Sequence, residues 1–518
     1  MSGGKPMSSP ISRRTLLRVT AGSAAAVATA AHAGAAGATA ARVPSVVREL
    51  EDKIREGMDR YAIPGVALGL YYRGTGYVRG FGVTDVRDPS PVDGDTVFRV
   101  ASTSKTFTGT AVMRLVESGR LDLDRTVRSY LPDFRTADPA ASARVTVRQV
   151  LNHSAGWLGD FFLDTGSGDD ALARYVTAMS GVPQLTPPGT VFAYNNAALA
   201  LAGRLIEVAT GTTYERAVRT LITDPLRLRH SAFFLDELPG ATVAVPHDVD
   251  ADGTPVARPG YWDLPRSINA AGGLISSARD QLRWARFHLG DGRPLLTRRS
   301  LHAMRSRPGP GGTLLVELDG MGVTWMLRPT AEGPRVVQHG GDWSGQHSGF
   351  LMVPERGFGL TVLTNSETGP ALIAELFADD WALRRFAGVS NLPATPHPVP
   401  AGILAGYQGR YTATVIDQDG TTGAASLDLV PDAGQLSVRV EDQEALRLAF
   451  YRPDYVRVFE PRGADTHVRA DFVRNPDGAV GWLRFSGRLF RRDTAPSTRS
   501  AGTRPLPLKP ATLPHPAR

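Results

Sequence analysis

Residues 95–105 of this 518-residue chain read Asp-Thr-Val-Phe-Arg-Val-Ala-Ser-Thr-Ser-Lys and end in the tetrapeptide Ser102-Thr103-Ser104-Lys105. Apolar residues recur at three- and four-residue spacing from Phe107 to Val116, so we predict a helix that begins near Ser102 and stops at Gly119. Three residues apart on a helix, the serine hydroxyl and the lysine amine share a face. A lysine whose pKa is lowered by burial or by positive potential can deprotonate that serine, and N–H groups at the helix start can stabilise an oxyanion.

Lysine usage supports this interpretation. The chain has four lysines, at positions 5, 53, 105 and 509, against 54 arginines. Arginine does not give up its proton near neutral pH, so a lysine retained in such a chain is a candidate for proton transfer. Lys53 lies in a charged stretch typical of a solvated helix face, whereas Lys105 does not. The tetrapeptide alone is weak evidence, because the pattern occurs by chance and also matches residues 2–5.

Composition narrows the class of protein. The absence of cysteine excludes a thiol nucleophile, disulfides and thiolate metal sites. The net charge of +7 comes from the two termini, since residues 1–40 and 495–518 contain basic but no acidic residues. It is therefore no argument for nucleic-acid binding. The chain lacks a His-Glu-x-x-His motif, a Gly-x-Ser-x-Gly elbow and a phosphate-binding loop. We expect no metal, no cofactor and no nucleic-acid partner.

The amino terminus resembles a twin-arginine export signal. Arg13-Arg14 precede an alanine-rich, weakly apolar run over residues 19–31, and small-x-small cleavage sites end at Ala33 and Ala40. The run is too short and too weakly apolar for a membrane anchor. We predict that residues 1–40 are a cleaved signal, that the protein is exported, and that no membrane span remains.

Strand and helix signals predict an α+β domain over residues 41–390. Strands are expected at 63–72 and 77–84, helices at 197–209 and 277–289, and strands again at 322–328, 336–338, 349–353 and 360–363. Strands at both ends of a helical section imply one sheet assembled from both ends of the domain, with helices packed on it.

A second, smaller domain is predicted after a proline-rich linker at residues 391–400. Residues 401–494 are almost wholly strand-like, with strands at 436–441, 467–473 and 482–490 and a turn at 475–478. They predict an antiparallel β domain. The proline-rich stretch 495–518 is expected to be a disordered tail.

Three ordered motifs carry a family resemblance. Ser102-Thr103-Ser104-Lys105, Tyr194-Asn195-Asn196 and His339-Gly340-Gly341 resemble the motifs of serine β-lactamases and penicillin-binding proteins, in particular class C β-lactamases, DD-peptidases, D-aminopeptidases and their esterase relatives. The flanking residues 95–101, 151–156 and 271–274 agree with this. The resemblance covers roughly residues 45–385, and it implies an antiparallel sheet flanked by helices. The C-terminal domain resembles the lipocalin-like domains appended to some relatives.

The resemblance also implies roles for individual residues. Ser102 would be acylated, and Lys105 and Tyr194 would share the general-base and general-acid work. The tyrosine is expected to have its pKa lowered by the neighbouring ammonium. Further expected contributions are a substrate hydrogen bond and support for the lysine from Asn196, a hydrogen-bond donor at His339, substrate contact at Gly341, and an oxyanion hole from the backbone N–H groups of Ser102 and Asp342. His153 and His347 are interpreted as structural histidines.

Position 339 departs from many relatives, which carry a lysine there. A histidine is largely neutral at pH 7, so attraction for the carboxylate of penicillins is weaker. We therefore expect an esterase or peptidase that acts on small molecules or D-amino-acid peptides, including peptidoglycan-derived ones. Two alternatives stay open: a β-lactamase, and a catalytically idle sensor that binds penicillin or peptidoglycan.

Overall fold

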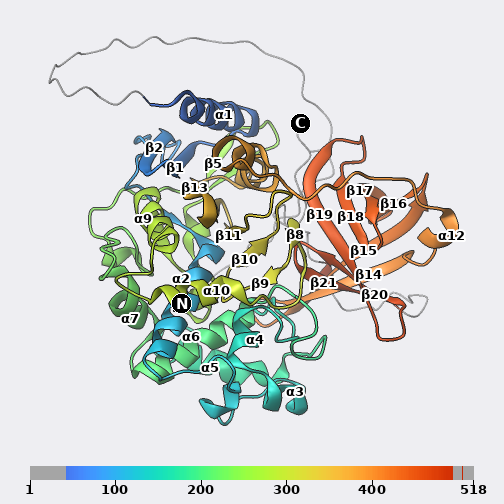
Figure 1. Cartoon of the computed structure of the whole chain (residues 1–518), viewed down its shortest axis with the longest axis horizontal. Helices are drawn as coiled ribbons and strands as arrows, with labels where there is room; N and C mark the ends of the chain where they lie inside the picture. Colours follow the sequence, from blue (N-terminus) through green and yellow to red (C-terminus); the bar gives the residue numbers. More distant parts are fainter. Residues whose placement is uncertain (1–42, 494–503, 506–518) are drawn as a thin grey trace, which may run out of the picture.

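The computed structural model describes residues 43–493 and 504–505. A central antiparallel sheet and a C-terminal β-barrel lie side by side, and a helical lobe packs below the sheet (Figure 1). The predicted signal at 1–40 lies outside the described residues. Of the predicted disordered tail, only Arg504–Pro505 is described, and it forms a short strand, β22, parallel to a barrel strand.

The central sheet joins the two ends of the first domain, as predicted. Its strand order is β2-β1-β13-β12-β11-β10-β9, and neighbouring strands run antiparallel. The amino-terminal strands β1 (Gly65–Tyr72) and β2 (Thr75–Gly82) therefore pair with strands from the far end of the domain. These are β9 (Gly320–Met321), β10 (Met326–Arg328), β11 (Val336–Trp343), β12 (Gln346–Val353) and β13 (Phe358–Thr364).

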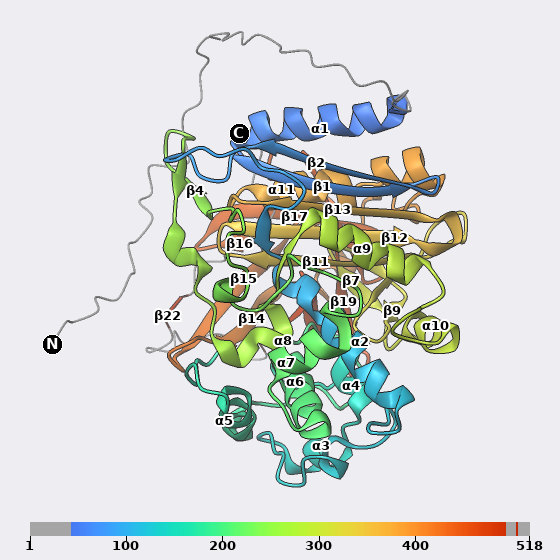
Figure 2. The ribbon, with the colours of Figure 1, turned by 90° about the vertical axis from the view of Figure 1, so that its left-hand side faces the viewer.

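Helices cover both faces of this sheet (Figure 2). Helices α1 (Ser45–Tyr61) and α11 (Gly369–Ile373) cover one face, where they share a buried apolar cluster with alternate residues of β1 and β13. Helices α2 (Ser104–Glu117) and α9 (Ala278–Leu289) pack on the other face within the largest apolar cluster. Gly69 lets α9 approach closely, because a Cβ there would lie 2.8 Å from the Ala278 carbonyl oxygen.

The remaining helices and short strands complete the first domain. The helices are α3 (Pro139–Arg144), α4 (Val147–Leu151), α5 (Ala171–Ala178), α6 (Asn196–Thr210), α7 (Tyr214–Val218), α8 (Asn269–Gly272) and α10 (Arg298–Ser306). Three two-stranded pairs are β3 (Val97–Arg99) with β6 (Ile275–Ser277), β4 (His247–Val249) with β5 (Pro255–Ala257), and β7 (Gly312–Leu314) with β8 (Val316–Leu318).

Two predicted strands are wrong in detail. The stretch 322–328 is not one strand, because a turn at Thr324 (φ 61°) separates β9 from β10. This turn packs on α2, where a Cβ at Gly109 would meet the Thr324 side chain at 2.2 Å. The stretch 482–490 is a hairpin rather than a strand, since the backbone reverses at Ser486 and Gly487, which both have positive φ.

The C-terminal residues form a closed antiparallel barrel after the short helix α12 (Ala401–Leu404). Strand β14 pairs with both β15 and β21, and this double pairing closes the barrel. Its interior is the third apolar cluster. The barrel strands are β14 (Gly409–Ile416), β15 (Thr422–Asp432), β16 (Gln435–Val440), β17 (Gln443–Arg452), β18 (Tyr455–Phe459), β19 (Asp465–Arg474), β20 (Val480–Phe485) and β21 (Arg488–Arg492).

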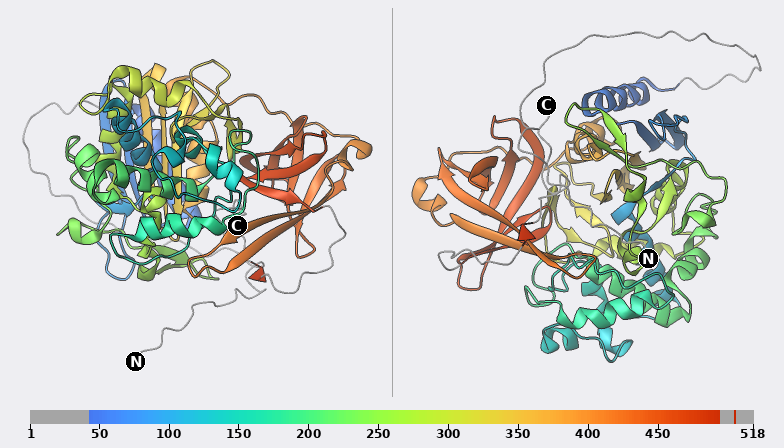
Figure 3. Two further views of the ribbon diagram at one scale, coloured as in Figure 1. Left: turned by 90° about the horizontal axis from the view of Figure 1, so that it is seen from below. Right: turned by 180° about the vertical axis from the view of Figure 1, so that it is seen from behind.

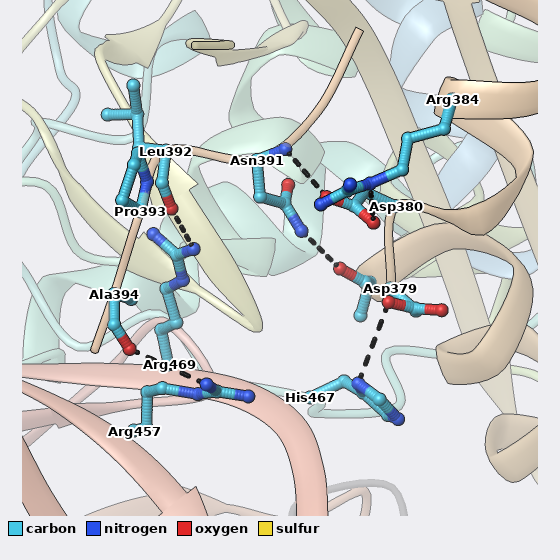
Figure 4. A pocket seen from close by; sticks show the side chains of 11 residues that line it. Asp379, Asp380, Arg384, Asn391, Leu392, Pro393, Ala394, Arg457, His467 and Arg469 are labelled. Atoms are coloured by element: carbon cyan, nitrogen blue, oxygen red, sulfur yellow. Dashed lines mark hydrogen bonds and ion pairs between the residues drawn. The ribbon is translucent and has the colours of Figure 1, made fainter. Parts of the chain in front are cut away.

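The linker between the two domains is held by arginines at a polar pocket of about 240 Å³ (Figure 4). Arg469 donates to the Leu392 carbonyl at 2.6 Å, and Arg457 reaches the Ala394 carbonyl at 3.5 Å. Asp379 and His467 face each other from the two domains. None of the predicted catalytic residues lines this pocket.

No helix among the described residues is both long and apolar enough to cross a membrane.

Candidate active site

The predicted nucleophile stands on a single 3-10 turn, Ala101–Thr103, that leads into α2. Ala101 has φ 44°, a left-handed conformation that costs free energy for a residue with a side chain. Neighbours hold this turn in place. Ser348 Oγ donates to the Val100 carbonyl at 2.8 Å, and Ser104 Oγ donates to the Ala101 carbonyl at 2.6 Å. The turn therefore fixes Ser102 at the start of α2, two residues before the α-helix itself begins.

Lys105 is completely buried and lies against the serine. Its Nζ is 2.9 Å from Ser102 Oγ, and it donates to the Ala271 carbonyl at 2.6 Å. Burial lowers the pKa of Lys105 well below its ordinary value, and the charge of Arg488 lowers this pKa further. A neutral amine next to a serine hydroxyl is the arrangement that a general base needs.

Tyr194 joins the pair, but its electrostatics differ from the expectation. Its hydroxyl is hydrogen-bonded to Ser102, and the ring centre lies 4.9 Å from Lys105 Nζ. Burial raises the pKa of Tyr194 above its ordinary value, and this effect outweighs the opposing hydrogen bond and the charge of Arg488. The expected lowering of this pKa by a neighbouring ammonium is not found, because burial has the largest influence on the Tyr194 pKa. Burial thus favours the phenol at Tyr194 and the free amine at Lys105.

His153 and Asn195 support the tyrosine. The His153 ring stacks on the Tyr194 ring with 4.7 Å between centres, and its Nδ1 accepts the Asn195 N–H at 2.8 Å. Burial lowers the pKa of His153 well below its ordinary value, so it packs as a neutral ring. Asn195 caps α6 through the Ala198 N–H. The interpretation of His153 as structural agrees with these contacts, although its place is directly beside the site.

Asn196 is directed at Asp160 instead of the lysine. Its Nδ2 donates to Asp160 Oδ1 at 2.8 Å, whereas Lys105 is held by the Ala271 carbonyl. The expected support of the lysine by Asn196 is therefore not what the geometry gives. Asn196 ties the start of α6 to the loop that carries Asp160.

His339 donates to the main chain, so the group that it can offer to a substrate is the acceptor Nε2 instead of the expected donor. Its Nδ1 is 2.6 Å from the Gly340 carbonyl, and a carbonyl can only accept, so Nδ1 carries the proton. Burial lowers the pKa of His339 to about 3 and the neighbouring Lys105 acts in the same direction, so the ring is neutral and Nε2 is unprotonated. Nε2 has no partner among the described residues. The ring centre lies 6.2 Å from that of Tyr194.

Strand β11 brings Gly341 against the nucleophile. A Cβ at Gly341 would lie 2.2 Å from the Val100 carbonyl oxygen and 2.7 Å from the Ser102 nitrogen, so only glycine fits. The backbone N–H of Ser102 thus borders β11, and Asp342 is the next residue of that strand. Both groups of the predicted oxyanion hole therefore belong to adjoining segments.

Two residues of the site were missed by the sequence analysis. Arg488, from the barrel strand β21, lies with its guanidinium carbon 4.8 Å from the Tyr194 ring centre. It pairs with Asp160, which also accepts from Asn196. No sequence signal links them, since Arg488 lies 328 residues after Asp160 and in another domain. Within residues 43–493, no group of three or more His, Asp or Glu side chains is arranged to hold a metal ion.

Comparison with known proteins places this site in a family. The Beta-lactamase family model matches residues 50–382, and the chain therefore belongs to the β-lactamase family of serine hydrolases. Penicillin-binding protein 4 of Amycolatopsis lactamdurans is 35% identical over 358 residues, which are 67% of this chain and 93% of that protein. The unguisins hydrolase of Aspergillus violaceofuscus is 26% identical and covers 84% of this chain and 88% of its own length.

Among solved structures, SurE with D-Leu matches with a TM-score of 0.66 and 28% identity. The match covers 86% of this chain and 98% of that one, so it includes the barrel as well as the first domain. The fold is thus β-lactamase/transpeptidase-like, as predicted, with a C-terminal eight-stranded antiparallel barrel.

Proposed function

We propose that this protein is a serine hydrolase that forms an acyl-enzyme on Ser102 and acts on esters or amides such as D-amino-acid peptides. The observation that carries the proposal is the contact at 2.9 Å between Ser102 Oγ and Nζ of the buried Lys105, whose pKa burial lowers well below its ordinary value. A protein that binds its ligand without forming a covalent bond to Ser102 does not need a base on the nucleophile. This favours an enzyme over the idle sensor.

The geometry supports a two-step reaction. Ser102 Oγ attacks the substrate carbonyl carbon while Lys105 Nζ takes the serine proton, and the oxyanion is held by the N–H groups of Ser102 and Asp342. Tyr194 then donates its phenolic proton to the leaving group and regains one from the Lys105 ammonium. Water repeats these steps in reverse at the ester carbon of the acyl-enzyme, which releases the acid and restores Ser102.

His339 supports a substrate other than a β-lactam. Its unprotonated Nε2 is an acceptor, and an acceptor cannot pair with the carboxylate of a penicillin or cephalosporin. An amide N–H or an amine of the substrate can donate to it. SurE was solved with D-Leu, and this similarity supports a D-amino-acid residue in the substrate.

We also propose export through the segment at residues 1–40. The twin arginines and the two small-x-small sites support it. In this proposal, the mature protein acts outside the cytoplasm on small-molecule or peptide substrates.

The proposal is tested by comparing the mature protein with its Ser102→Ala variant on four substrates. These are a short-chain p-nitrophenyl ester, a D-amino-acid anilide, a D-Ala-D-Ala peptide and a chromogenic cephalosporin. We expect turnover of the ester or of a D-amino-acid substrate that falls at least about 10³-fold in the variant, as removal of a nucleophile does. Equal turnover by both proteins would refute the assignment. The cephalosporin as preferred substrate would instead make the protein a β-lactamase.

A further inference from the structure

One hairpin of the barrel reaches the catalytic tyrosine. The Gly487 carbonyl, in the turn between β20 and β21, accepts the Tyr194 N–H at 2.8 Å. Gly487 has φ 74°, and a Cβ there would lie 3.0 Å from Tyr194 Cβ and 2.9 Å from Leu314 Cδ1. The turn is therefore built against the first domain, and only glycine combines this conformation with this close approach.

Arg488, the residue after this turn, places a permanent positive charge against the Tyr194 ring, which Lys105 also contacts. Arg488 Nε is 3.0 Å from Asp160 Oδ2, and its guanidinium carbon and Lys105 Nζ lie 4.8 Å and 4.9 Å from the centre of the same Tyr194 ring. Asp160 is in turn fixed by Asn196 and by a second barrel segment, since Ile416 donates its N–H to the Asp160 carbonyl at 2.9 Å.

We infer that Arg488, which contacts the same tyrosine ring as Lys105, is a positioning residue through which the barrel favours Lys105 as proton acceptor. Arginine does not deprotonate in proteins, so the charge of the partly exposed Arg488 disfavours a second charge on the completely buried Lys105. This inference rests on the proposed function, because it assigns a role to Arg488 only if Lys105 is the base.

The other charged groups near the lysine do not replace this effect. His153 and His339 are neutral, since burial depresses the pKa of each far below the ordinary histidine value. Tyr194 is an uncharged phenol. Asp160 favours the protonated lysine, but its influence on the Lys105 pKa is smaller than that of Arg488. Arg488 is thus the neighbour that favours the free amine.

The inference is tested on the full chain by the pH dependence of kcat/KM for a neutral p-nitrophenyl ester, which has no carboxylate that could form an ion pair with a guanidinium. In Arg488→Gln the acidic limb should move to higher pH, and a shift of about one unit lowers activity on that limb about tenfold. Arg488→Lys keeps a positive charge only while that lysine stays protonated, so it should restore the wild-type profile in part. Arg491→Gln is the matched control, because Arg491 is on the same strand but is exposed and lies 5.9 Å from the Trp482 ring centre.

Asp160→Asn is a second variant, and it should shift the acidic limb in the opposite direction. It removes the negative charge that favours protonated Lys105, so its acidic limb should move to lower pH. Thermal unfolding of each variant shows whether it remains folded, and a misfolded Arg488→Gln leaves the test to Asp160→Asn and Arg488→Lys.

Two results would overturn the inference. An acidic limb at the wild-type pH with a uniformly lower kcat would make Arg488 a structural residue only. A higher KM confined to a peptide with a free carboxylate, with an unchanged ester profile, would make it a substrate ligand. Both results leave the loss of activity in Ser102→Ala intact, so this inference can fail while the proposed function stands.

Discussion

At the scale of single residues, burial shifts the pKa of each candidate catalytic group. Burial lowers the pKa of Lys105 and raises that of Tyr194 because charge is costly without water, and the same effect lowers the pKa of His339 to about 3. The sequence predicted these residues as members of one site, and the structure brings them together. It did not reveal the direction of the Tyr194 shift or the hydrogen-bonding role of His339, because both depend on desolvation by residues distant in the chain.

His347 is the opposite case, a buried histidine that carries charge. Burial disfavours its protonation, but hydrogen bonds and charge from Asp342 and Glu367 outweigh burial and raise the pKa of His347 to about 9. Its Nδ1 is 2.9 Å from Asp342 Oδ1, and its Nε2 is 3.4 Å from Glu367 Oε2. The imidazolium thus supports the residue that follows Gly341 on β11.

This pair of contacts predicts a pH-dependent contribution to stability. The folded pKa lies above the ordinary value of about 6.5, so the contribution is fully present below pH 6.5 and is lost as the pH rises through 9. Denaturant unfolding of wild type and His347→Gln at several pH values should show a stability difference that is largest near pH 6 and shrinks by pH 10. A difference that is constant over this range would contradict a charged His347.

At the scale of elements, the site is assembled where the start of α2, the start of α6, strand β11 and the β20–β21 hairpin meet. Helices α2 and α6 begin at a 3-10 turn and at an asparagine cap, and both features fix a functional side chain at a helix start. The hairpin contributes through a main-chain hydrogen bond to Tyr194. A change in the geometry of this hairpin should therefore affect catalysis as well as the folding of the barrel.

Substitutions at two glycines can distinguish an effect on catalysis from an effect on barrel folding. Gly487 and Gly478 both lie in barrel turns with positive φ, but a Cβ at Gly478 would meet no atom within 4 Å, whereas one at Gly487 would press on Tyr194. Alanine at either position should cost about 1–2 kcal/mol of stability from backbone strain. Only Gly487→Ala should also lower kcat, by roughly tenfold, through a displaced tyrosine. Equal kcat values for the two variants in steady-state assays would show that the hairpin does not position Tyr194.

At the scale of the whole molecule, the barrel lies against the first domain (Figure 3). Buried charges join the two domains in addition to the linker. Glu317, a buried residue of β8, forms ion pairs with Arg452 and Arg469 of the barrel at 2.8 and 3.3 Å. On the barrel side, the buried Asp471 pairs with Arg484 and accepts from Thr313 of the first domain at 2.6 Å. Separating the domains would leave such charges buried without partners, or expose the surface around them.

The two domains should therefore unfold together. Calorimetry of the full chain should give one transition whose calorimetric and van't Hoff enthalpies agree, because partial unfolding would break these buried pairs. Two resolved transitions, or a calorimetric enthalpy well above the van't Hoff value, would mean that the barrel is an independent unit and that its contacts with the site are loose.

Local sequence patterns were enough to predict the candidate catalytic residues and their order along the chain. Three short motifs contain them: Ser102 and Lys105, then Tyr194, then His339. Each motif lies at a helix start or on a strand, and neighbouring residues encode such local geometry. The paired strands at both ends of the first domain and the alternating strands after residue 400 were predicted for the same reason, since they follow from hydrophobic periodicity.

Only the folded structure shows which distant residues lie around these motifs. The contact of Arg488 with Asp160 joins residues 328 positions apart, and a predicted strand at 482–490 proved to be the hairpin that brings them together. The pKa shifts of Lys105, Tyr194 and His339 depend on burial, and the barrel contacts Tyr194 through Gly487 and Arg488. Long-range contacts and desolvation are properties of the packed chain, so no local pattern in the sequence could have revealed that the barrel completes the surroundings of the catalytic base.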